Sequence, residues 1–286
     1  MPMNTALAGR SYPETRHKVT SKATQQYARA TNELNPRFFE GSDDLIAPPL
    51  YPVVYHPRAL GQAIGDPELG IDFKRALHGE QDMKFHAPIR PGDEITTAAR
   101  IESIREKGTG ETITLDIVSH NQDGVLVEST LFTLFVRGPS GGAGAETGTA
   151  KAATEDSSPT EEPIARVVQQ LDDDQTFRYS EASGDRTRIH LDEGSARRAG
   201  LPGIIGHGLC TMAFVSRALC DELAEGEPTR LARMSLRFAQ PVIPGEKIET
   251  RIWAGDEPGQ FRFETLDPRG KPVVSRGLAE IREKAS

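Results

Sequence analysis

The sequence predicts an α+β protein made of two copies of one fold. The strongest observation is an internal repeat. Residues 84–97 and 237–250 share, in step, a basic residue, a Phe, a Pro, a Pro-Gly-acidic turn and an Ile-x-Thr ending. A shorter match places residues 27–31 opposite residues 179–183. Self-similarity over such long segments indicates a duplicated fold rather than chance likeness of two turns.

A compositional break separates the two copies. Residues 138–163 are mostly Gly, Ala, Ser, Thr, Pro and Glu, with no aromatic residue. Such a segment has too little apolar surface to offset the entropy of ordering, so it predicts a flexible linker. The flanking segments, 1–137 and 164–286, are each of ordinary single-domain size.

Each copy shows helical material followed by strands. In the second copy, residues 208–224 carry apolar side chains at three- and four-residue spacing, which predicts a helix. Residues 232–238 then alternate between apolar and polar, as in a strand with one buried face. Further strands are expected at 248–252, 261–265 and 273–281, and in the first copy at 113–117 and 125–136. We therefore expect one long helix before a long antiparallel sheet in each half.

Composition excludes some classes of partner. The formal net charge is −8, from 34 Lys and Arg against 42 Asp and Glu, which disfavours a nucleic-acid-binding surface but allows a local site for a small phosphorylated ligand. No run of apolar residues reaches membrane-spanning length, and the start has no signal-type apolar core. Cys210 and Cys220 lie about 15 Å apart by helical rise, too far for a disulfide. We expect a soluble, cytoplasmic protein with free thiols.

Two segments of the second copy contain residues suited to catalysis. Asp185 and His190 lie in a loop-like stretch, where a carboxylate and an imidazole can face one water, although a helix-capping Asp and a surface His explain the same letters. Gly203 to Gly208 precede the predicted helix, and a free N–H at the helix start suits a developing negative charge. The alternative is a glycine-rich loop that lets the helix enter a crowded sheet.

A third candidate lies in the first copy. The His-Gly-Glu-Gln element at 78–81 could contribute to a functional site, but it is equally compatible with a turn before a strand.

Two other patterns are set aside. Residues 138–142 fit G-x-S-x-G, but a nucleophile elbow needs a strand before it and a helix after it, and a linker follows here. His190, Asp192 and His207 do not have the spacing of a metal motif, and a helix-capping or supporting role fits these residues better. We therefore expect no metal site.

Taken together, residues 183–213 resemble the signature of the MaoC-like, type-2 (R)-specific enoyl-CoA hydratases, in which S-G-D-x-N-P-[LI]-H-x-D is followed by a His-Gly step that opens a helix. The elements at 78–81 and 107–110 resemble those of the two-copy, eukaryotic-type members. The resemblance extends nearly end to end. It implies a double hotdog, in which two tandem hotdog units, each a long helix wrapped by an antiparallel sheet, join side by side.

The resemblance also implies roles for individual residues. Asp185 and His190 become the catalytic pair, and the backbone N–H of Gly208 becomes the donor to the thioester oxygen. The implied reaction is addition of water to a 2-enoyl-CoA, or its reverse on a 3-hydroxyacyl thioester, with an acyl-CoA or acyl-carrier-protein thioester as substrate, no cofactor, and a homodimer as the assembly. The implied substrate contacts are His78, Gly79, Lys107, Gly184, Arg186, Thr187, Arg188, Ile189 and Phe238.

By the same comparison, the first copy is a degenerate unit that binds the acyl chain. Glu33 falls opposite Asp185 and Phe38 opposite His190, while Tyr55 and His56 are expected opposite His207 and Gly208. The apolar segment 48–54 is expected to line an acyl tunnel.

The chain departs from the family pattern at Thr187 and Arg188, where Asn-Pro is usual. This removes a side chain that supports the loop and adds charge near the site. A hotdog thioesterase and a non-catalytic acyl-thioester-binding partner therefore stay open as alternatives.

Overall fold

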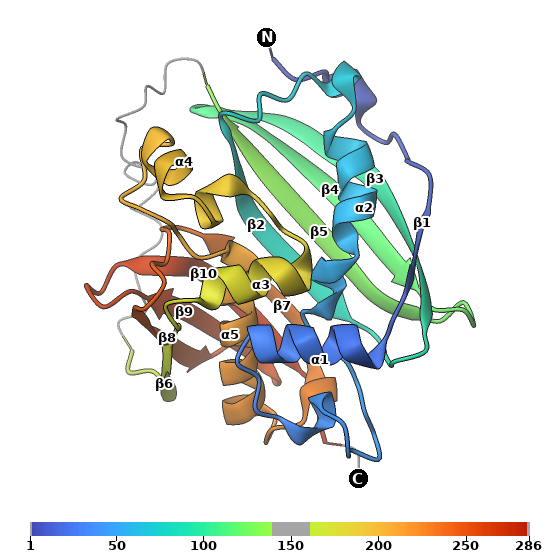
Figure 1. Cartoon of the computed structure of the whole chain (residues 1–286), viewed down its shortest axis with the longest axis vertical. Helices are drawn as coiled ribbons and strands as arrows, with labels where there is room; N and C mark the ends of the chain where they lie inside the picture. The colour runs from blue at the N-terminus through green and yellow to red at the C-terminus, as the bar shows by residue number, and fades with distance from the viewer. Residues whose placement is uncertain (1, 139–160, 285–286) are drawn as a thin grey trace.

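The computed structural model describes residues 2–138 and 161–284; residues 139–160, where most of the predicted linker and the G-x-S-x-G pattern fall, lie outside that part. Ten antiparallel strands form one sheet in the order β1-β3-β4-β5-β2-β7-β10-β9-β8-β6. Each half contributes five strands, and the halves meet at β2 and β7. Counted inward from the two edges, the strands of one half therefore correspond in order to the strands of the other. The labelled helices lie over one face of the sheet (Figure 1).

The two halves contain corresponding elements in the same order, except that the second half has one additional helix, α4. The first half has β1 (Thr15–Lys18), α1 (Ser21–Ala30), α2 (His56–Ile64), β2 (Ala76–Phe85), β3 (Glu94–Lys107), β4 (Gly110–His120) and β5 (Leu126–Arg137). The second half has β6 (Ala165–Gln170), α3 (Gln175–Ser183), α4 (Glu193–Arg198), α5 (Gly208–Leu223), β7 (Leu231–Phe238), β8 (Lys247–Ala254), β9 (Gln260–Leu266) and β10 (Pro272–Ile281). Short 3₁₀ helices are η1 (Thr5–Leu7), η2 (Pro36–Phe38), η3 (Tyr51–Val54), η4 (Pro67–Leu69), η5 (Arg188–His190) and η6 (Pro228–Arg230). This repetition confirms the predicted duplication, and a strand lies at each position where one was expected. No range was predicted for helix α4 or for the strands β1, β2, β3 and β6.

Helix α5 is the core of the second half. Its middle residues, from Cys210 to Cys220, are buried on almost every side, as expected of a helix enclosed by a sheet and other helices. Both cysteines are buried and free. No helix in the described ranges is long and apolar enough to cross a membrane.

The first half lacks the single long helix expected there. Its helical segment is η3 followed by α2, with a break at Tyr55. Pro57 explains the break, because proline has no N–H to bond backward and its ring collides with the preceding turn.

The loop that leads into each main helix is anchored by the same two backbone hydrogen bonds. They run from Ile46 N to Arg37 O (3.0 Å) and from Ala47 N to Ile89 O (2.8 Å) in the first half, and from Ile205 N to Ile189 O (3.4 Å) and from Gly206 N to Val242 O (2.7 Å) in the second. Ile46 and Ala47 are therefore the counterparts of Ile205 and Gly206.

This correspondence changes one sequence assignment. Pro48 and Pro49, and not Tyr55 and His56, stand opposite the His-Gly step that opens α5. The prediction was wrong because the second half carries α4 just before this point, which lengthens its loop and shifts the alignment.

Strands β2 and β7 join the halves through the middle of the sheet. Their register runs from the Glu80–Arg237 pair to the Lys84–Arg233 pair. On the helix side, Met83 lies opposite Met234, and both are fully buried. On the other side, the Arg233 guanidinium donates two hydrogen bonds to Asp82, at 2.9 and 2.7 Å.

We expect Met83→Ala to lower the free energy of unfolding by about 2–5 kcal/mol, because it removes a buried side chain at this junction and leaves a cavity. Lys84→Ala, one residue away and exposed, should change it by less than about 0.5 kcal/mol. Urea unfolding followed by circular dichroism measures both. Equal, small effects would show that the halves do not depend on this packing.

Candidate active site

Asp185 enters the site directly after helix α3. The helix ends at Gly184, whose φ of +80° lies in the left-handed region that favours glycine. The next amide, of Asp185, donates to Ser183 Oγ at 3.2 Å. Gly184 thus turns the chain so that the carboxylate follows at once.

Thr187 holds the Asp185 carboxylate. Its amide and its hydroxyl both donate to Asp185 Oδ1, at 3.0 and 2.6 Å. Burial disfavours the ionised carboxylate, but the bonds from Thr187 and the nearby His207 and His190 outweigh burial and lower its pKa. The loop is therefore supported, contrary to the expectation from the missing Asn, and Oδ2 accepts no hydrogen bond from the described residues.

His190 is oriented by a backbone carbonyl. Its Nδ1–H donates to Ile205 O at 2.9 Å, and this bond leaves Nε2 as the free acceptor of a neutral ring. Burial lowers the His190 pKa below its ordinary value of 6.5, although the Ile205 carbonyl and Asp185 oppose the shift. At neutral pH His190 is therefore uncharged and can accept a proton.

His207 supports the other two groups. Its Nδ1 lies 3.0 Å from the Thr176 hydroxyl and its Nε2 lies 3.2 Å from the Asp185 carbonyl oxygen. Its ring stacks on that of His190 at 3.9 Å between centroids. Burial, together with the neighbouring His190, lowers its pKa to about 4. His207 is a neutral positioning residue with neither nitrogen free.

The side chains of Asp185, His190 and His207 offer ligand atoms within 4.8 Å of one another. A metal ion fits poorly here, because both nitrogens of His207 already have protein partners and stacked rings do not point their lone pairs at one centre. Asp192, the acid in the metal pattern set aside above, instead caps α4 by accepting from Ser195 N at 2.8 Å.

Gly208 presents a free amide next to these groups. As the first residue of α5 it has no intrahelical acceptor, and its N–H bonds to none of the described residues. A Cβ at this position would lie 3.0 Å from the Phe238 ring. Glycine is needed because the ring closes over the helix start, and the exposed N–H suits a developing oxyanion.

The first half contributes His78 to this region. The His78 ring lies 4.8 Å from that of Phe238 and 4.3 Å from that of Phe132, and its Nε2 lies 3.0 Å from Gln81 Oε1. Burial lowers its pKa to about 4, with Asp185 acting in the opposite direction. Gly79 is the extra residue of a bulge in β2. His78 and Phe238 therefore meet at the junction of the halves, beside Gly208.

Other predicted substrate contacts lie farther out. Arg186 and Arg188 are exposed, and Ile189 supplies the carbonyl that anchors Ile205. Lys107 sits at the tip of the β3–β4 hairpin, in a charged hollow of about 530 Å³ that also takes in Arg105 and Glu80. No contact in the described part of the chain joins Lys107 to the catalytic pair.

Sequence reasoning missed Thr176. Its hydroxyl lies 3.0 Å from the His190 carbonyl oxygen and 3.0 Å from His207 Nδ1, so it ties α3 to both histidines. A buried threonine in the first turn of a helix belongs to no sequence motif. The one available signal was that Thr176 lies on the helix that ends just before Asp185.

Family models cover both halves. Residues 6–130 match the FAS1-like dehydratase domain region and residues 154–266 match the MaoC-like domain. A probable enoyl-CoA hydratase 2 of Dictyostelium discoideum is 30% identical over 256 residues, covering 85% of this chain and 83% of that protein. The 3-hydroxyacyl-thioester dehydratase Y of Mycobacterium tuberculosis is 37% identical over 193 residues, covering 66% and 65%.

Some relatives are much longer. The mouse peroxisomal multifunctional enzyme type 2 is 30% identical over 246 residues, but the match spans only 33% of that enzyme and 85% of this chain.

Solved structures agree on the fold. A MaoC-like dehydratase from Phytophthora capsici superposes with a TM-score of 0.81 at 26% identity over 98% of each chain. A Mycobacterium tuberculosis protein described as a double hotdog superposes with a TM-score of 0.57 at 13% identity over 96% of each chain. The predicted double hotdog is confirmed, and the chain belongs to the MaoC-like dehydratase family.

Proposed function

We propose that the chain adds water across the double bond of a 2-enoyl-CoA to give an (R)-3-hydroxyacyl-CoA, or removes it in reverse. One observation carries the proposal. Asp185 and His190, each with a free acceptor atom, lie together with His207, and the free amide of Gly208 directly follows His207 in the chain. The chain also belongs to a family whose relatives are named hydratases and dehydratases.

The geometry supports a single-water mechanism. At neutral pH the carboxylate is ionised and the imidazole is neutral, so each accepts a hydrogen bond from one O–H of the same water. The water oxygen attacks C3 of the enoyl thioester, and electron density moves to the thioester oxygen, where the Gly208 amide stabilises it. The pair takes the proton from the water and returns it to C2, so all atoms of the water are accounted for.

The substrate contacts belong to the same proposal. The catalytic half, 164–286, supplies the loop of Gly184, Arg186, Thr187, Arg188 and Ile189 together with Phe238, and the first half, 1–137, supplies His78, Gly79 and Lys107. No resident cofactor is required, because both bases and the oxyanion donor are protein groups. A homodimer and a cytoplasmic location complete the proposal, and light scattering and cell fractionation test them.

The assay that separates hydratase from thioesterase follows two signals with a panel of enoyl-CoA thioesters. A hydratase removes the conjugated-thioester absorbance without releasing thiol. Release of free CoA instead, with the conjugated bond intact, would identify a thioesterase and contradict the proposal.

We expect Asp185→Asn and His190→Gln each to lower turnover by about 100- to 10,000-fold, because each removes one base from the shared water. The double variant should be little worse than either single one, since the two act as a unit. Glu33→Gln is the matched control: its carboxyl is the first-half counterpart of Asp185, 7% exposed, with a pKa that burial raises to about 8. It should leave turnover unchanged. Additive losses in the double variant would rule out one shared water.

The pH dependence follows from His190. The neutral ring is the active form and burial lowers its pKa, so kcat/KM should be level above pH 6.5 and fall on the acid side with a midpoint below 6.5. Initial rates between pH 4.5 and about 8.5 measure this profile. A midpoint above 6.5 would mean that the site favours the protonated imidazole.

Charge reversal at Lys107 tests the proposed CoA contact. Lys107→Glu should raise KM for CoA thioesters severalfold, leave kcat nearly unchanged, and act more weakly at high salt, because the interaction is a screened charge contact. A pantetheine thioester without the nucleotide should not respond, and Lys18→Glu is the control for net charge. An equal effect on the pantetheine thioester would place Lys107 away from the nucleotide.

A further inference from the structure

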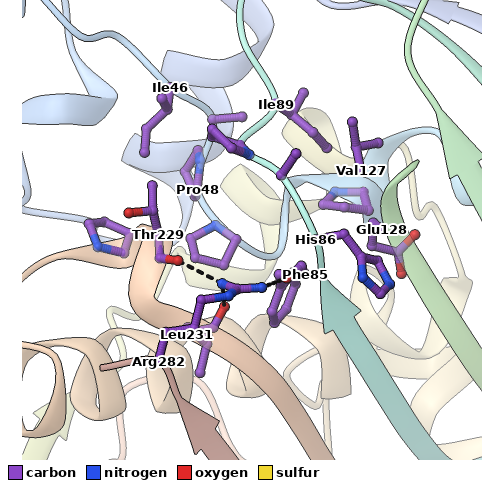
Figure 2. A pocket seen from close by; sticks show the side chains of 16 residues that line it. Ile46, Pro48, Phe85, His86, Ile89, Val127, Glu128, Thr229, Leu231 and Arg282 are labelled. Atoms are coloured by element: carbon purple, nitrogen blue, oxygen red, sulfur yellow. Dashed lines mark hydrogen bonds between the residues drawn. The ribbon is translucent and has the colours of Figure 1, made fainter. Parts of the chain in front are cut away.

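A second cavity lies at the other end of the β2–β7 junction. Figure 2 shows it between the loop that precedes η3, the end of β2 with the residues after it, and the C-terminal residues of the second half. Its volume is about 210 Å³. Most of its wall is apolar, including Ile46, Pro48, Ile89, Val127 and Leu231.

This cavity is the first-half counterpart of the active site. The shared anchoring bonds place Pro48 and Pro49 of its wall where the second half has His207 and Gly208. In the sequence repeat, Phe85 of its wall corresponds to Phe238. The cavity therefore occupies, at the other end of the junction, the position that the candidate active site has in the second half.

The counterpart has lost its catalytic groups. Phe38, at the position of His190, is 1% exposed and packs against Ile46 and Ala28. Pro49 has no N–H to stabilise an oxyanion. Glu33 is buried and its carboxyl is protonated at neutral pH. The cavity therefore lacks the counterparts of the catalytic pair and of the amide donor.

Arg282 lines this apolar hollow from a solvent-exposed position. Its guanidinium donates to the carbonyl oxygens of Thr229 (2.7 Å), Leu231 (3.2 Å) and Phe85. No carboxylate in the described ranges pairs with it. Because a guanidinium has five N–H donors, two remain for a ligand.

The acid in the wall is already engaged. Glu128 is fully buried, and its carboxylate oxygens lie 3.0 Å from His56 Nε2 and 3.3 Å from Ser119 Oγ, with a further bond from Thr130. Its carboxylate oxygens are therefore occupied by these partners, and it forms no ion pair with Arg282 in the described part of the chain.

The two hollows are separate. His78 and Phe85 lie at opposite ends of β2, about 23 Å apart at the rise of a β-strand. Between them on the helix side, Met83 and Met234 are both fully buried. One acyl chain bound at the catalytic pair does not fill both hollows without displacing this packing.

We propose that the counterpart cavity is a non-catalytic binding site for a medium-chain carboxylate, with the apolar chain inside and the carboxylate on Arg282. The volume exceeds the roughly 150 Å³ of an apolar cavity that holds benzene, which is room for a short alkyl chain. The carboxylate supplies the charge that Arg282 lacks, through charge-assisted hydrogen bonds. The proposal concerns binding alone and does not depend on hydratase activity.

Octanoate is the probe. Isotope-filtered nuclear Overhauser spectra of the full chain with octanoate should show contacts from the alkyl chain to the methyl groups of Val127 and Ile89. Arg282→Gln should raise the octanoate Kd about five- to tenfold. Lys84→Gln removes a nearby exposed charge that does not line the cavity, and should leave the Kd unchanged. Octanol should bind equally well to the wild type and to Arg282→Gln.

Filling the cavity gives the second arm. Ala87→Phe places a ring in the hollow and should abolish the contacts to Val127 and Ile89. Contacts that appear only at Phe238, or equal effects of the Arg282 and Lys84 variants, would overturn the proposal. So would a selective loss of long-chain enoyl-CoA hydration in Ala87→Phe, because the cavity would then be the far end of the substrate tunnel. If Ala87→Phe does not fold, the octanoate Kd of Arg282→Gln and the Overhauser contacts in the wild-type protein test the proposal.

Discussion

The pairing of β2 with β7 is the constraint on which the rest of the structure depends. It merges two five-stranded halves into one sheet and fixes which ends of the halves meet. Because the strands are antiparallel, the start of β2 lies beside the end of β7, and His78 of the first half comes next to Phe238 of the second. The first half therefore brings a side chain next to Phe238, although both candidate bases come from the second half.

Within the site, backbone atoms orient the side chains. The Ile205 carbonyl selects the tautomer of His190, and the Asp185 carbonyl holds His207. Thr187 and Thr176 supply the hydroxyls that complete this network. Small polar residues are well suited to orienting these side chains, because they form hydrogen bonds to nearby main-chain and side-chain atoms. Thr187 therefore supports the loop without the asparagine of the family pattern, because it gives Asp185 two donors.

Some of this could be predicted from the sequence. The alternation of apolar and polar residues at 232–238 and the apolar spacing at 208–224 are local signals. They predicted a strand and a helix, and the structure has β7 and α5 at these positions. The Asp185–His190 spacing, read with the Gly208 step, located the candidate bases and the amide donor. The first-half counterpart of the His207–Gly208 step could not be located from the sequence. Helix α4 lengthens the loop of the second half only, so an alignment that ignores the extra residues selects Tyr55 and His56 in place of Pro48 and Pro49. Thr176 was missed since its role depends on a helix position that only the folded chain defines.

The two hollows show how one scaffold supports different demands. In the second half the proposed oxyanion donor is a free amide beside the Phe238 ring, and a Cβ there would lie 3.0 Å from that ring, so a larger residue at Gly208 would force the ring to shift. In the first half Pro49 stands under Phe85 instead, where no amide is required and a rigid apolar residue can line a wall. The prolines that interrupt the first-half helix are tolerated for the same reason, because no reacting group depends on where that helix begins. The backbone of the first half is therefore under fewer constraints at this position, while the β2–β7 junction holds both halves in one sheet.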